Sequence, residues 1–228
     1  MRILIDIGHP AHVHYFRHYM RIMEGKGHQF LVIARDKEIT ITLLEKYGIP
    51  FFNRGKGGTS LLGKLGYILK ADLFIWKKAR KFKPDLFLSF ASTYAAHASW
   101  LCRKPHIALD DTEHAKLELL LYPPFTQVIF TPSSFKKDLG KKQIRFNSYM
   151  ELASLHPNYF QANPSIYEEL GISQGTPYAI VRFISWNASH DVGQSGISAD
   201  VKVKFITELS THLKVFISSE GQLPESLT

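Results

Sequence analysis

The sequence predicts an α/β protein with a parallel, doubly wound sheet, followed by the beginning of a second α/β unit. From the N-terminus to Pro132, short apolar runs alternate with longer amphipathic stretches, as strands and helices do when helices cover both faces of one sheet. Of the 228 residues, 45% are hydrophobic, which is enough for a substantial core. Such sheets bind ligands at the carboxyl ends of their strands, so the polar residues after each strand form the candidate site.

The strands of the first unit are predicted from apolar runs that end in glycine, proline or polar residues. They cover residues 2–7, 29–34, 50–52, 85–90, 106–109 and 128–131. The helices are predicted from apolar residues at helical spacing. They cover residues 12–25, 38–47, 61–82, 93–102 and 114–121. Glycines after the first two helices and a proline after the last strand mark where these elements end.

The pattern changes after the first unit. Residues 143–157 contain short strand-like pieces, and residues 158–176, which include Pro164, are typical of a linker with a helix at 165–170. A strand at 178–184, a helix at 200–213 and a strand at 215–218 then begin a second unit. Two strands and one helix make a poor domain by themselves. The sequence therefore predicts a complete domain over 1–157 and a partial, truncated one over 177–228.

The turn after the first strand predicts a ligand site. Gly8 can adopt backbone angles closed to other residues, and Pro10 suits the first turn of a helix. The N–H groups at a helix N-terminus form a ready anion site. We expect Gly8 to contact the substrate at this turn, chiefly by shaping it.

Histidines follow that glycine closely. Imidazole has a pKa near neutral pH, which suits a general base, so we predict His12 first and His9 second for this role. The alternative is that the histidines cap the helix and fill the turn. His14 and Arg17 lie further along the helix and are predicted as substrate contacts, Arg17 with an anionic group. Because positions i and i+2 do not share a helix face, no metal site is predicted here.

Acidic and hydroxyl groups follow two later strands. Asp110, Asp111 and Glu113 are predicted as catalytic or orienting carboxylates, and His114 as a substrate contact. Ser89 and Thr93 are predicted to bind hydroxyls of an acceptor. The alternative for each group is capping of the next helix, with Asp111 or Thr112 as the N-cap.

The net charge of +8 is concentrated in one segment. Residues 54–83 hold nine basic side chains and one acidic one, among many apolar residues. Such a helix suits an anionic membrane surface, and a packed helix with a solvated basic face is the equal alternative. The sequence shows no nucleic-acid-binding motif, so nucleic acid is not predicted. The basic residues are Arg54, Lys56, Lys64, Lys70, Lys77, Lys78, Arg80, Lys81 and Lys83.

The location expected for the protein is the cytoplasm, with peripheral contact at the inner face of the membrane. Cys102 is the single cysteine, which fits a reducing compartment. The sequence has no signal peptide and no apolar run of about 18 residues that would span a bilayer.

Four stretches resemble a known family. They are DIGHPAHVHYFR at 6–17, LDDTEHA at 109–115, PNYFQANPSIYEELGI at 157–172 and VRFISWNASHDVGQSGIS at 181–198. Because they follow the family's order through nearly the whole chain, the sequence is identified as a member of domain of unknown function 354. That family is similar to the GT-B superfamily, in which two Rossmann-like domains face each other across the active site. The superfamily includes nucleotide-sugar glycosyltransferases and non-hydrolysing UDP-N-acetylglucosamine 2-epimerases.

The resemblance implies a GT-B-like fold with an acceptor-side first domain and a nucleotide-sugar-side second domain, which longer family members complete. By position, the loop after the strand at 178–184 faces the phosphates of the donor. The expected donor contacts are Arg182, Ser185, Ser189, His190 and Asp191, with Ser219 and Glu220 after the next strand.

The expected function is glycosyltransferase-like action on a nucleotide-sugar, here a UDP-sugar, in the synthesis of a surface polysaccharide or glycolipid. A UDP-sugar 2-epimerase is the first alternative, and a non-catalytic remnant or a membrane- or partner-docking module is the second. The expected partners are the nucleotide-sugar donor and a sugar or glycolipid acceptor. No cofactor and no bound metal are expected, because the nucleotide-sugar is itself the substrate.

Overall fold

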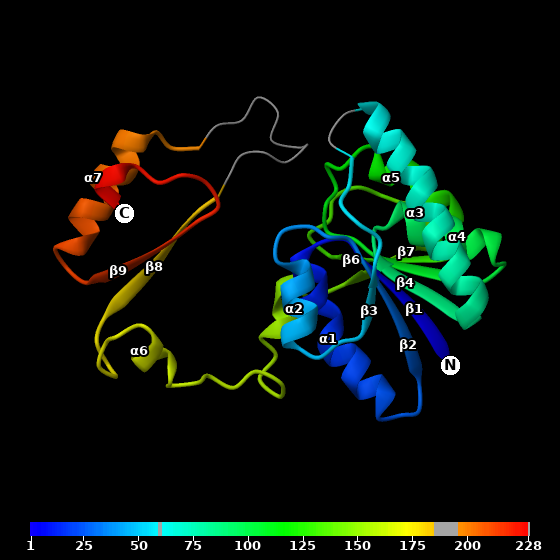
Figure 1. Ribbon diagram of the computed structural model, residues 1–228, viewed down its shortest axis with the longest axis horizontal. Coiled ribbons are helices and arrows are strands. Elements are labelled where there is room, and N and C mark those ends of the chain that lie inside the picture. Colours follow the sequence, from blue (N-terminus) through cyan, green and yellow to red (C-terminus); the bar gives the residue numbers. More distant parts are fainter. Residues whose placement is uncertain (59–60, 185–195, 228) are drawn as a thin grey trace. The chain divides into compact units, whose positions relative to one another are not determined.

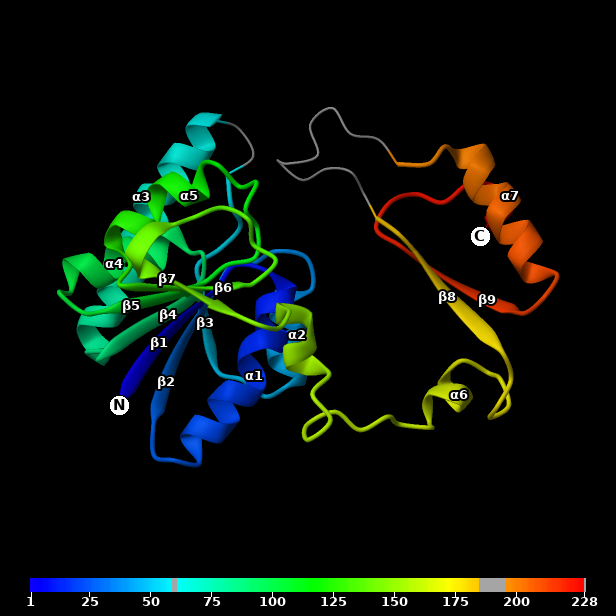
Figure 2. The same ribbon diagram turned by 180° about the vertical axis from the view of Figure 1, so that it is seen from behind.

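A computed structural model describes residues 1–58, 61–184 and 196–227 of the chain (Figures 1 and 2). It divides into two compact units, Met1–Phe160 and Gln161–Thr228. The boundary falls inside the stretch predicted as a linker. The two units are described separately below.

The first unit is built on a seven-stranded sheet in which every neighbouring pair is parallel, as the sequence predicts. The strand order is β3-β2-β1-β4-β5-β6-β7, so the direction of winding reverses between β1 and β4. β7 was predicted only as a strand-like piece. The strands are β1 Arg2–Ile7, β2 Gln29–Ala34, β3 Phe51–Asn53, β4 Leu86–Phe90, β5 His106–Leu109, β6 Val128–Pro132 and β7 Gln143–Phe146.

Helices cover both faces of this sheet (Figures 1 and 2). Alternate residues of β1 point to opposite faces. Ile3, Ile5 and Ile7 join a core with α1, whereas Leu4 joins a core with α3 and α4. The helices are α1 Pro10–Glu24, α2 Thr40–Lys46, α3 Leu61–Phe82, α4 Thr93–Leu101 and α5 Glu118–Leu121, with 3-10 turns η1 Pro123–Phe125, η2 Gly140–Lys142 and η3 Met150–Ser154.

Three helix starts in the first unit differ from the prediction by two residues or more. Helix α2 begins at Thr40 instead of residue 38. Helix α1 begins at Pro10, because the His9 side chain caps it by accepting the Ala11 N–H at 3.2 Å. The helix predicted over 114–121 begins only at Glu118. Asp110 holds the preceding turn by accepting the Thr112 N–H at 2.9 Å. The predicted N-cap role for Asp111 or Thr112 is therefore wrong.

The second unit contains two parallel strands, β8 Tyr178–Phe183 and β9 Lys214–Ser219, which pair in register from Tyr178 opposite Lys214 to Phe183 opposite Ser219. Helix α7, Ala199–Ser210, connects them, and Ser198 caps its N-terminus. The short helix α6, Ile166–Glu169, precedes β8, and the 3-10 turn η4, Glu225–Leu227, follows β9. Among the described residues of this unit, the buried apolar side chains are Phe183 and Ile206.

Candidate functional site

The candidate site lies at the carboxyl ends of β1 and β4, where the winding of the sheet reverses. Asp6 of β1 and Ser89 of β4 are register partners at this edge. The turn at Gly8 continues β1 into α1, and the turn at Ala91 continues β4 into α4. Ala91 has a φ of 46°, a left-handed conformation that costs a residue with a side chain about 1 kcal/mol. This reversal is where doubly wound sheets form their ligand crevice.

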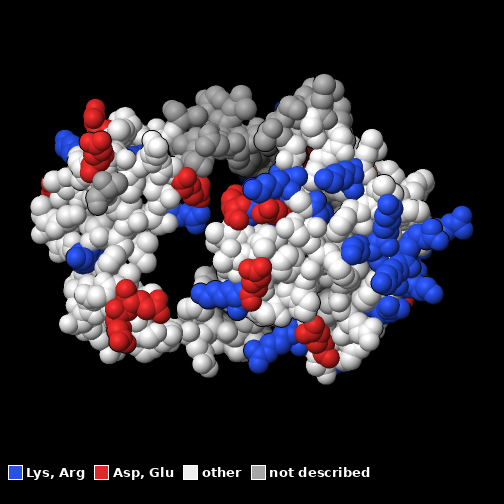
Figure 3. Space-filling view, in the orientation of Figure 1, with Lys and Arg blue, Asp and Glu red and all other residues white. Residues whose placement is uncertain are grey.

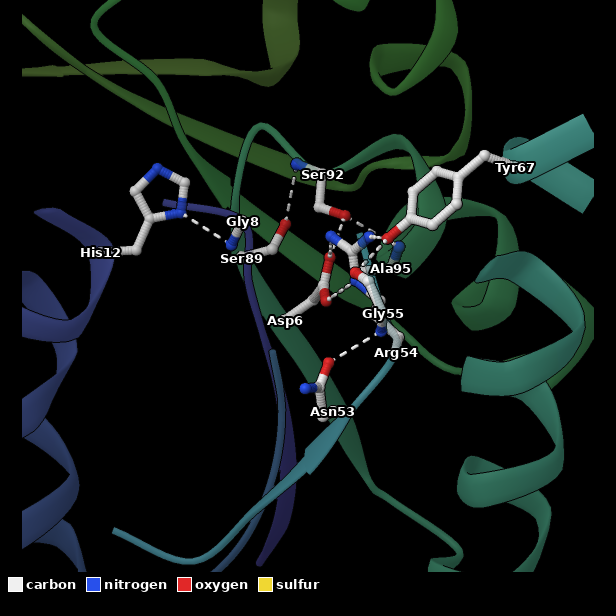
Figure 4. Close-up of polar contacts among 10 residues, drawn as sticks. All are labelled: Asp6, Gly8, His12, Asn53, Arg54, Gly55, Tyr67, Ser89, Ser92 and Ala95. Carbon is white, nitrogen blue, oxygen red and sulfur yellow. Dashed lines mark hydrogen bonds and ion pairs between the residues drawn. The ribbon is translucent and has the colours of Figure 1, made fainter. Parts of the chain in front are cut away.

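A buried ion pair underlies this edge (Figure 4). The Arg54 guanidinium donates to both carboxylate oxygens of Asp6, Nε to Oδ1 at 2.9 Å and Nη2 to Oδ2 at 3.2 Å. Its Nη1 donates to the Tyr67 hydroxyl of α3, and its Cζ lies 4.6 Å from the ring centroid of Tyr94. Arg54 is only 4% exposed. Arg54 is therefore not available to the anionic membrane surface predicted for residues 54–83, because its charge is used inside the protein.

Ser92 connects the ion pair to α4. Its hydroxyl donates to Asp6 Oδ2 at 2.5 Å and accepts the Ala95 N–H at 3.2 Å as the N-cap of the helix. Its own N–H donates to Ser89 Oγ at 3.1 Å (Figure 4). Ser92 therefore fixes the start of α4 against the end of β1.

A chain of hydrogen bonds continues from Ser89 into the interior. The Thr126 hydroxyl donates to the Tyr122 carbonyl at 2.8 Å, so it accepts from His106 Nδ1 at 2.8 Å. Burial lowers the pKa of His106 to about 3, so its ring is neutral and its Nε2 accepts from the Ser89 hydroxyl at 2.9 Å.

This network corrects two predicted acceptor contacts. Ser89 is fully buried, and its hydroxyl both donates to His106 and accepts from Ser92. Thr93 is 7% exposed. Both side chains therefore belong to the interior beneath the site, and their predicted contact with an acceptor is not supported.

The N-terminus of α1 does not form the predicted anion site. Pro10 has no N–H, the Ala11 N–H donates to His9 Nδ1, and the His12 N–H donates to the His9 carbonyl. The Gly8 N–H donates to His12 Nδ1 at 3.2 Å. The φ of Gly8 is not positive, so unusual backbone angles do not explain this glycine. The first-turn donors that would hold a phosphate already have partners.

His12 is a neutral imidazole in this turn. Burial first, and then the proximity of His9, Lys37 and Arg54, lowers its pKa to about 3. Because Nδ1 accepts the Gly8 N–H, the proton of the neutral ring lies on Nε2. The predicted pKa near neutrality is therefore wrong, and the ring is suited to donate a hydrogen bond from Nε2. His9 lies 3.8 Å from Glu38 through its Nε2 and caps the helix through its Nδ1.

An aromatic wall stands beside His12. The rings of Tyr15 and Phe90 have centroids 5.4 Å apart, and the His12 centroid lies 4.7 Å from that of Phe90. Burial, followed by the charges of Asp111 and Glu151, raises the pKa of Tyr15 to about 12. The charges of two residues thus act on this hydroxyl, Asp111 from the segment after β5 and Glu151 from η3, which packs against α1.

The predicted acidic cluster separates into different roles. Asp110 is 1% exposed and accepts the Tyr122 hydroxyl at 2.7 Å, and burial raises its pKa. Glu113 accepts the backbone N–H of Lys136 at 2.5 Å and so ties down the loop after β6. Both carboxylates are thus held by groups of the protein itself.

Asp111 stays at the edge of the site. Burial raises its pKa, and its Oδ1 accepts the Thr112 hydroxyl at 2.8 Å. Glu151 raises the pKa further, whereas His114 lowers it, so both residues act on this carboxylate.

Two predicted contacts on α1 lie elsewhere. The His14 ring packs edge-on against Tyr47, with centroids 5.8 Å apart, and the Arg17 Cζ lies 4.6 Å from the same ring centroid. Burial and the Arg17 charge lower the pKa of His14. Both side chains therefore face the segment after α2, away from the aromatic wall.

In the second unit, Arg182 and Glu220 lie at the carboxyl ends of β8 and β9. They form an exposed ion pair with an Nη2–Oε1 distance of 2.5 Å. The Ser219 hydroxyl donates to the Gly221 carbonyl in a local turn. The other predicted donor contacts, Ser185, Ser189, His190 and Asp191, lie outside the described residues.

Several residues of the edge were not predicted from the sequence. Asp6 gave a signal, since an acid within an apolar strand needs a partner. His106 at the start of an apolar strand gave a similar one. The aromatic wall gave none, because Tyr15 and Phe90 are separated in sequence and read as ordinary core residues.

The parallel sheet with its reversal at β1 and β4, followed by a second α/β unit, gives the chain a GT-B-like fold. The chain belongs to the family described as "Protein of unknown function (DUF354)", whose sequence profile matches residues 1–220. This confirms the resemblance found in the sequence. The uncharacterized protein MJ0665 of Methanocaldococcus jannaschii is 25% identical over 228 residues, which cover 96% of this chain and 67% of the relative.

Solved structures share the fold at low identity. The UDP-GlcNAc 2-epimerase from Methanocaldococcus jannaschii matches with a TM-score of 0.65 and 12% identity over 96% of this chain. The spinosyn forosaminyltransferase SpnP matches with a TM-score of 0.57 and 14% identity over 100% of this chain and 69% of its own. The chain spans 65% of the length of the epimerase.

Loss of either partner of the ion pair should destabilise the first unit. Arg54→Met or Asp6→Leu leaves one buried charge unpaired, which should lower the free energy of unfolding by about 3–5 kcal/mol. The double variant removes both charges and should lose clearly less than the sum of the single variants. Urea unfolding measures all three, with exposed Arg80→Met as the matched control. Additive losses would contradict a coupled pair.

The His12 ring should stay neutral across the physiological range. Because its folded pKa lies far below the unfolded value near 6.5, the folded ring should take up no proton between pH 8 and 5, whereas the chain in denaturing urea should titrate there. Nitrogen-15 NMR of the side chain reports both protonation and tautomer. The expected result is protonated Nε2 throughout. A titration midpoint near pH 6.5 in the folded protein would restore the general-base role.

Proposed function

We propose that the protein acts on a nucleotide-sugar and transfers the sugar to an acceptor held at the carboxyl edge of the first sheet. The aromatic wall of Tyr15 and Phe90 beside the Asp111 carboxylate carries this proposal. Aromatic faces pack against the apolar faces of sugar rings, and carboxylates accept hydrogen bonds from their hydroxyls. The GT-B fold and the named epimerase and transferase support a nucleotide-sugar as the donor.

The chemistry assigns different roles to the predicted residues. An acceptor hydroxyl attacks the anomeric carbon, the bond from that carbon to the diphosphate breaks, and the hydroxyl proton passes to a base. Asp111 is a better base than His12, since burial raises the pKa of Asp111 toward the operating pH. His12, with its proton on Nε2, donates a hydrogen bond to an acceptor or donor oxygen.

The donor diphosphate is assigned to the second unit. Arg182 is the cation at the end of β8, and the four donor contacts predicted over 185–191 follow it in sequence. Guanidinium groups suit diphosphates because they donate in pairs. In this proposal the diphosphate displaces or shares the exposed contact of Arg182 with Glu220. The donor is a UDP-sugar, and the acceptor is a sugar of a surface polysaccharide or a glycolipid.

A UDP-sugar 2-epimerase is the second candidate. The named epimerase has a higher TM-score than the named transferase, 0.65 against 0.57. Epimerisation needs acid and base groups near one ring carbon, and Asp111 and Glu151 both act on the Tyr15 hydroxyl. In that reaction the sugar changes configuration on the nucleotide, and the acceptor is not needed.

Proton NMR of the chain with UDP-GlcNAc and sugar acceptors separates these functions. Transfer releases UDP and forms a new glycoside, whereas epimerisation yields an isomeric UDP-sugar. Asp111→Asn should slow either reaction by about 10²–10⁴-fold, because it removes the base. Tyr15→Ala should weaken sugar binding, and exposed Glu118→Gln is the matched control. No reaction and no saturable binding of UDP or UDP-GlcNAc would refute the proposal.

We also propose that one face of α3 rests on an anionic membrane. Leu69 and Leu73 are 74% and 48% exposed, one helical turn apart. Exposed cations lie on the same side of the helix as these two leucines. The buried residues of α3, which begin at Tyr67, lie on the opposite side. Lys and Arg side chains gather over this side of the first unit (Figure 3). These cations are Lys70, Lys77, Arg80 and Lys81. Among the described residues, no helix is long and apolar enough to cross a membrane.

The basic residues predicted for this surface do not all lie on it. Arg54 is buried against Asp6, and Lys78 Nζ lies 3.5 Å from the ring centroid of Phe52. Lys56 and Lys83 are exposed outside the helix, and the Lys64 side chain lies outside the described residues. The proposed contact is therefore limited to the exposed face of α3.

Co-sedimentation with lipid vesicles tests this surface. Vesicles that contain phosphatidylglycerol should bind the chain, and neutral phosphatidylcholine vesicles should not. Each of Lys77→Glu and Lys81→Glu should weaken binding about fivefold or more, because a cation near the surface contributes about 1 kcal/mol. The control reverses Lys136 and Lys137, which are exposed beyond β6. Equal binding by the α3 variants and wild type would contradict membrane contact through this helix.

A further inference from the structure

A cavity lies at the opposite edge of the first sheet. Its volume is about 360 Å³, and it is lined by the second half of α1, the first half of β2 and the segment before β3. β2 enters it through Phe30 and Val32, near its amino end, and residues 47–50 lie before β3 begins. The carboxyl-edge site uses the other ends of these strands. A volume of this size is in the range of small-molecule sites.

Two side-chain nitrogens of the lining residues have no hydrogen-bond partner within the described part of the chain. They are Arg17 Nε and His18 Nε2, and both are buried. A buried polar group without a partner costs about 1–3 kcal/mol. The same two side chains line the cavity through their other atoms, so an anion bound there would lie beside both.

Aromatic rings pack against both side chains. The Arg17 Cζ lies 4.6 Å from the ring centroid of Tyr47, the residue at the C-terminus of α2. The His18 ring lies 5.3 Å from that of Tyr159, centroid to centroid. Burial, followed by the charges of Arg17 and Arg21, lowers the pKa of His18, so its ring is a neutral hydrogen-bonding group.

The charge of the lining selects an anion. Arg17 and Arg21 are one turn apart on α1 and both line the cavity, and Glu24 is the single acid among its lining residues. The remaining walls include the apolar side chains of Met20, Phe30 and Ile49. A ligand that fits both the arginines and the apolar walls carries one anionic group and a ring or short apolar body.

We propose that this cavity binds a small organic anion, with its phosphate or carboxylate on Arg17 and His18 and its body against Phe30. The site is independent of the carboxyl-edge site. His12 and Arg17 are five residues apart on α1, which places them about 7.5 Å apart along the helix axis and on different faces. The predicted role of Arg17 as an anion contact is therefore retained, but in a different site.

Isothermal titration calorimetry with phenyl phosphate, benzoate and inorganic phosphate tests the proposal on the whole chain. Wild type should bind at least one of the two aromatic anions saturably, and inorganic phosphate more weakly. Tighter binding of phenyl phosphate identifies a phosphate site, and tighter binding of benzoate identifies a carboxylate site. Arg17→Met and Arg21→Met should each weaken binding at least tenfold.

Arg103→Met is the matched control, since this exposed arginine lies after α4. It should bind like wild type. The side-chain Nε–H resonance of Arg17 should also shift on titration of wild type, which keeps the test decisive if a variant does not fold. No saturable binding of either aromatic anion, an unmoved Arg17 resonance, or an equal loss in Arg103→Met would overturn the proposal.

Discussion

The geometry of the carboxyl edge depends on one buried ion pair. Asp6 is a charged residue inside a central strand, and the Arg54 guanidinium together with the Ser92 hydroxyl compensates for its burial. Through Asp6 and Arg54, β1 is joined to the segment after β3, to the Tyr67 hydroxyl of α3 and to the N-cap of α4. The turns that carry His12 and Ser92 start from this ion pair, so the shape of the site depends on how the buried charge of Asp6 is compensated.

The Asp6–Arg54 ion pair also affects which groups at the carboxyl edge can donate or accept a proton. Arg54 is among the groups that lower the pKa of His12, and the Gly8 N–H occupies its Nδ1. A histidine that looks like a base in the sequence is therefore a hydrogen-bond donor in the fold. The carboxylate of Asp111, with its raised pKa, is left as the group most able to take a proton. Both groups lie near Tyr15, His12 with its ring centroid 6.3 Å from that of Tyr15 and Asp111 through its charge on the Tyr15 hydroxyl.

The sequence predicts the local structure well because its signals are local. Periodicity and turn residues placed α3 at residues 61–82 and β5 at residues 106–109, and both bounds are confirmed. The site was harder to predict from the sequence, because its key contacts join distant parts of the chain. Asp6 and Arg54 are 48 residues apart, and an arginine in a glycine-rich loop looks solvated until its partner is known. Burial likewise decided the pKa of His12, and no spacing rule reports burial of a single side chain.

The hydrogen bonds beneath the edge have a further property. From Ser92 through Ser89, His106 and Thr126 to the Tyr122 carbonyl, every donor points the same way, away from Asp6. Reversing the His106 tautomer would leave that carbonyl without its donor. One arrangement of hydrogens therefore satisfies every donor and acceptor in this series, and the hydrogen bonds beneath the site all run in one direction.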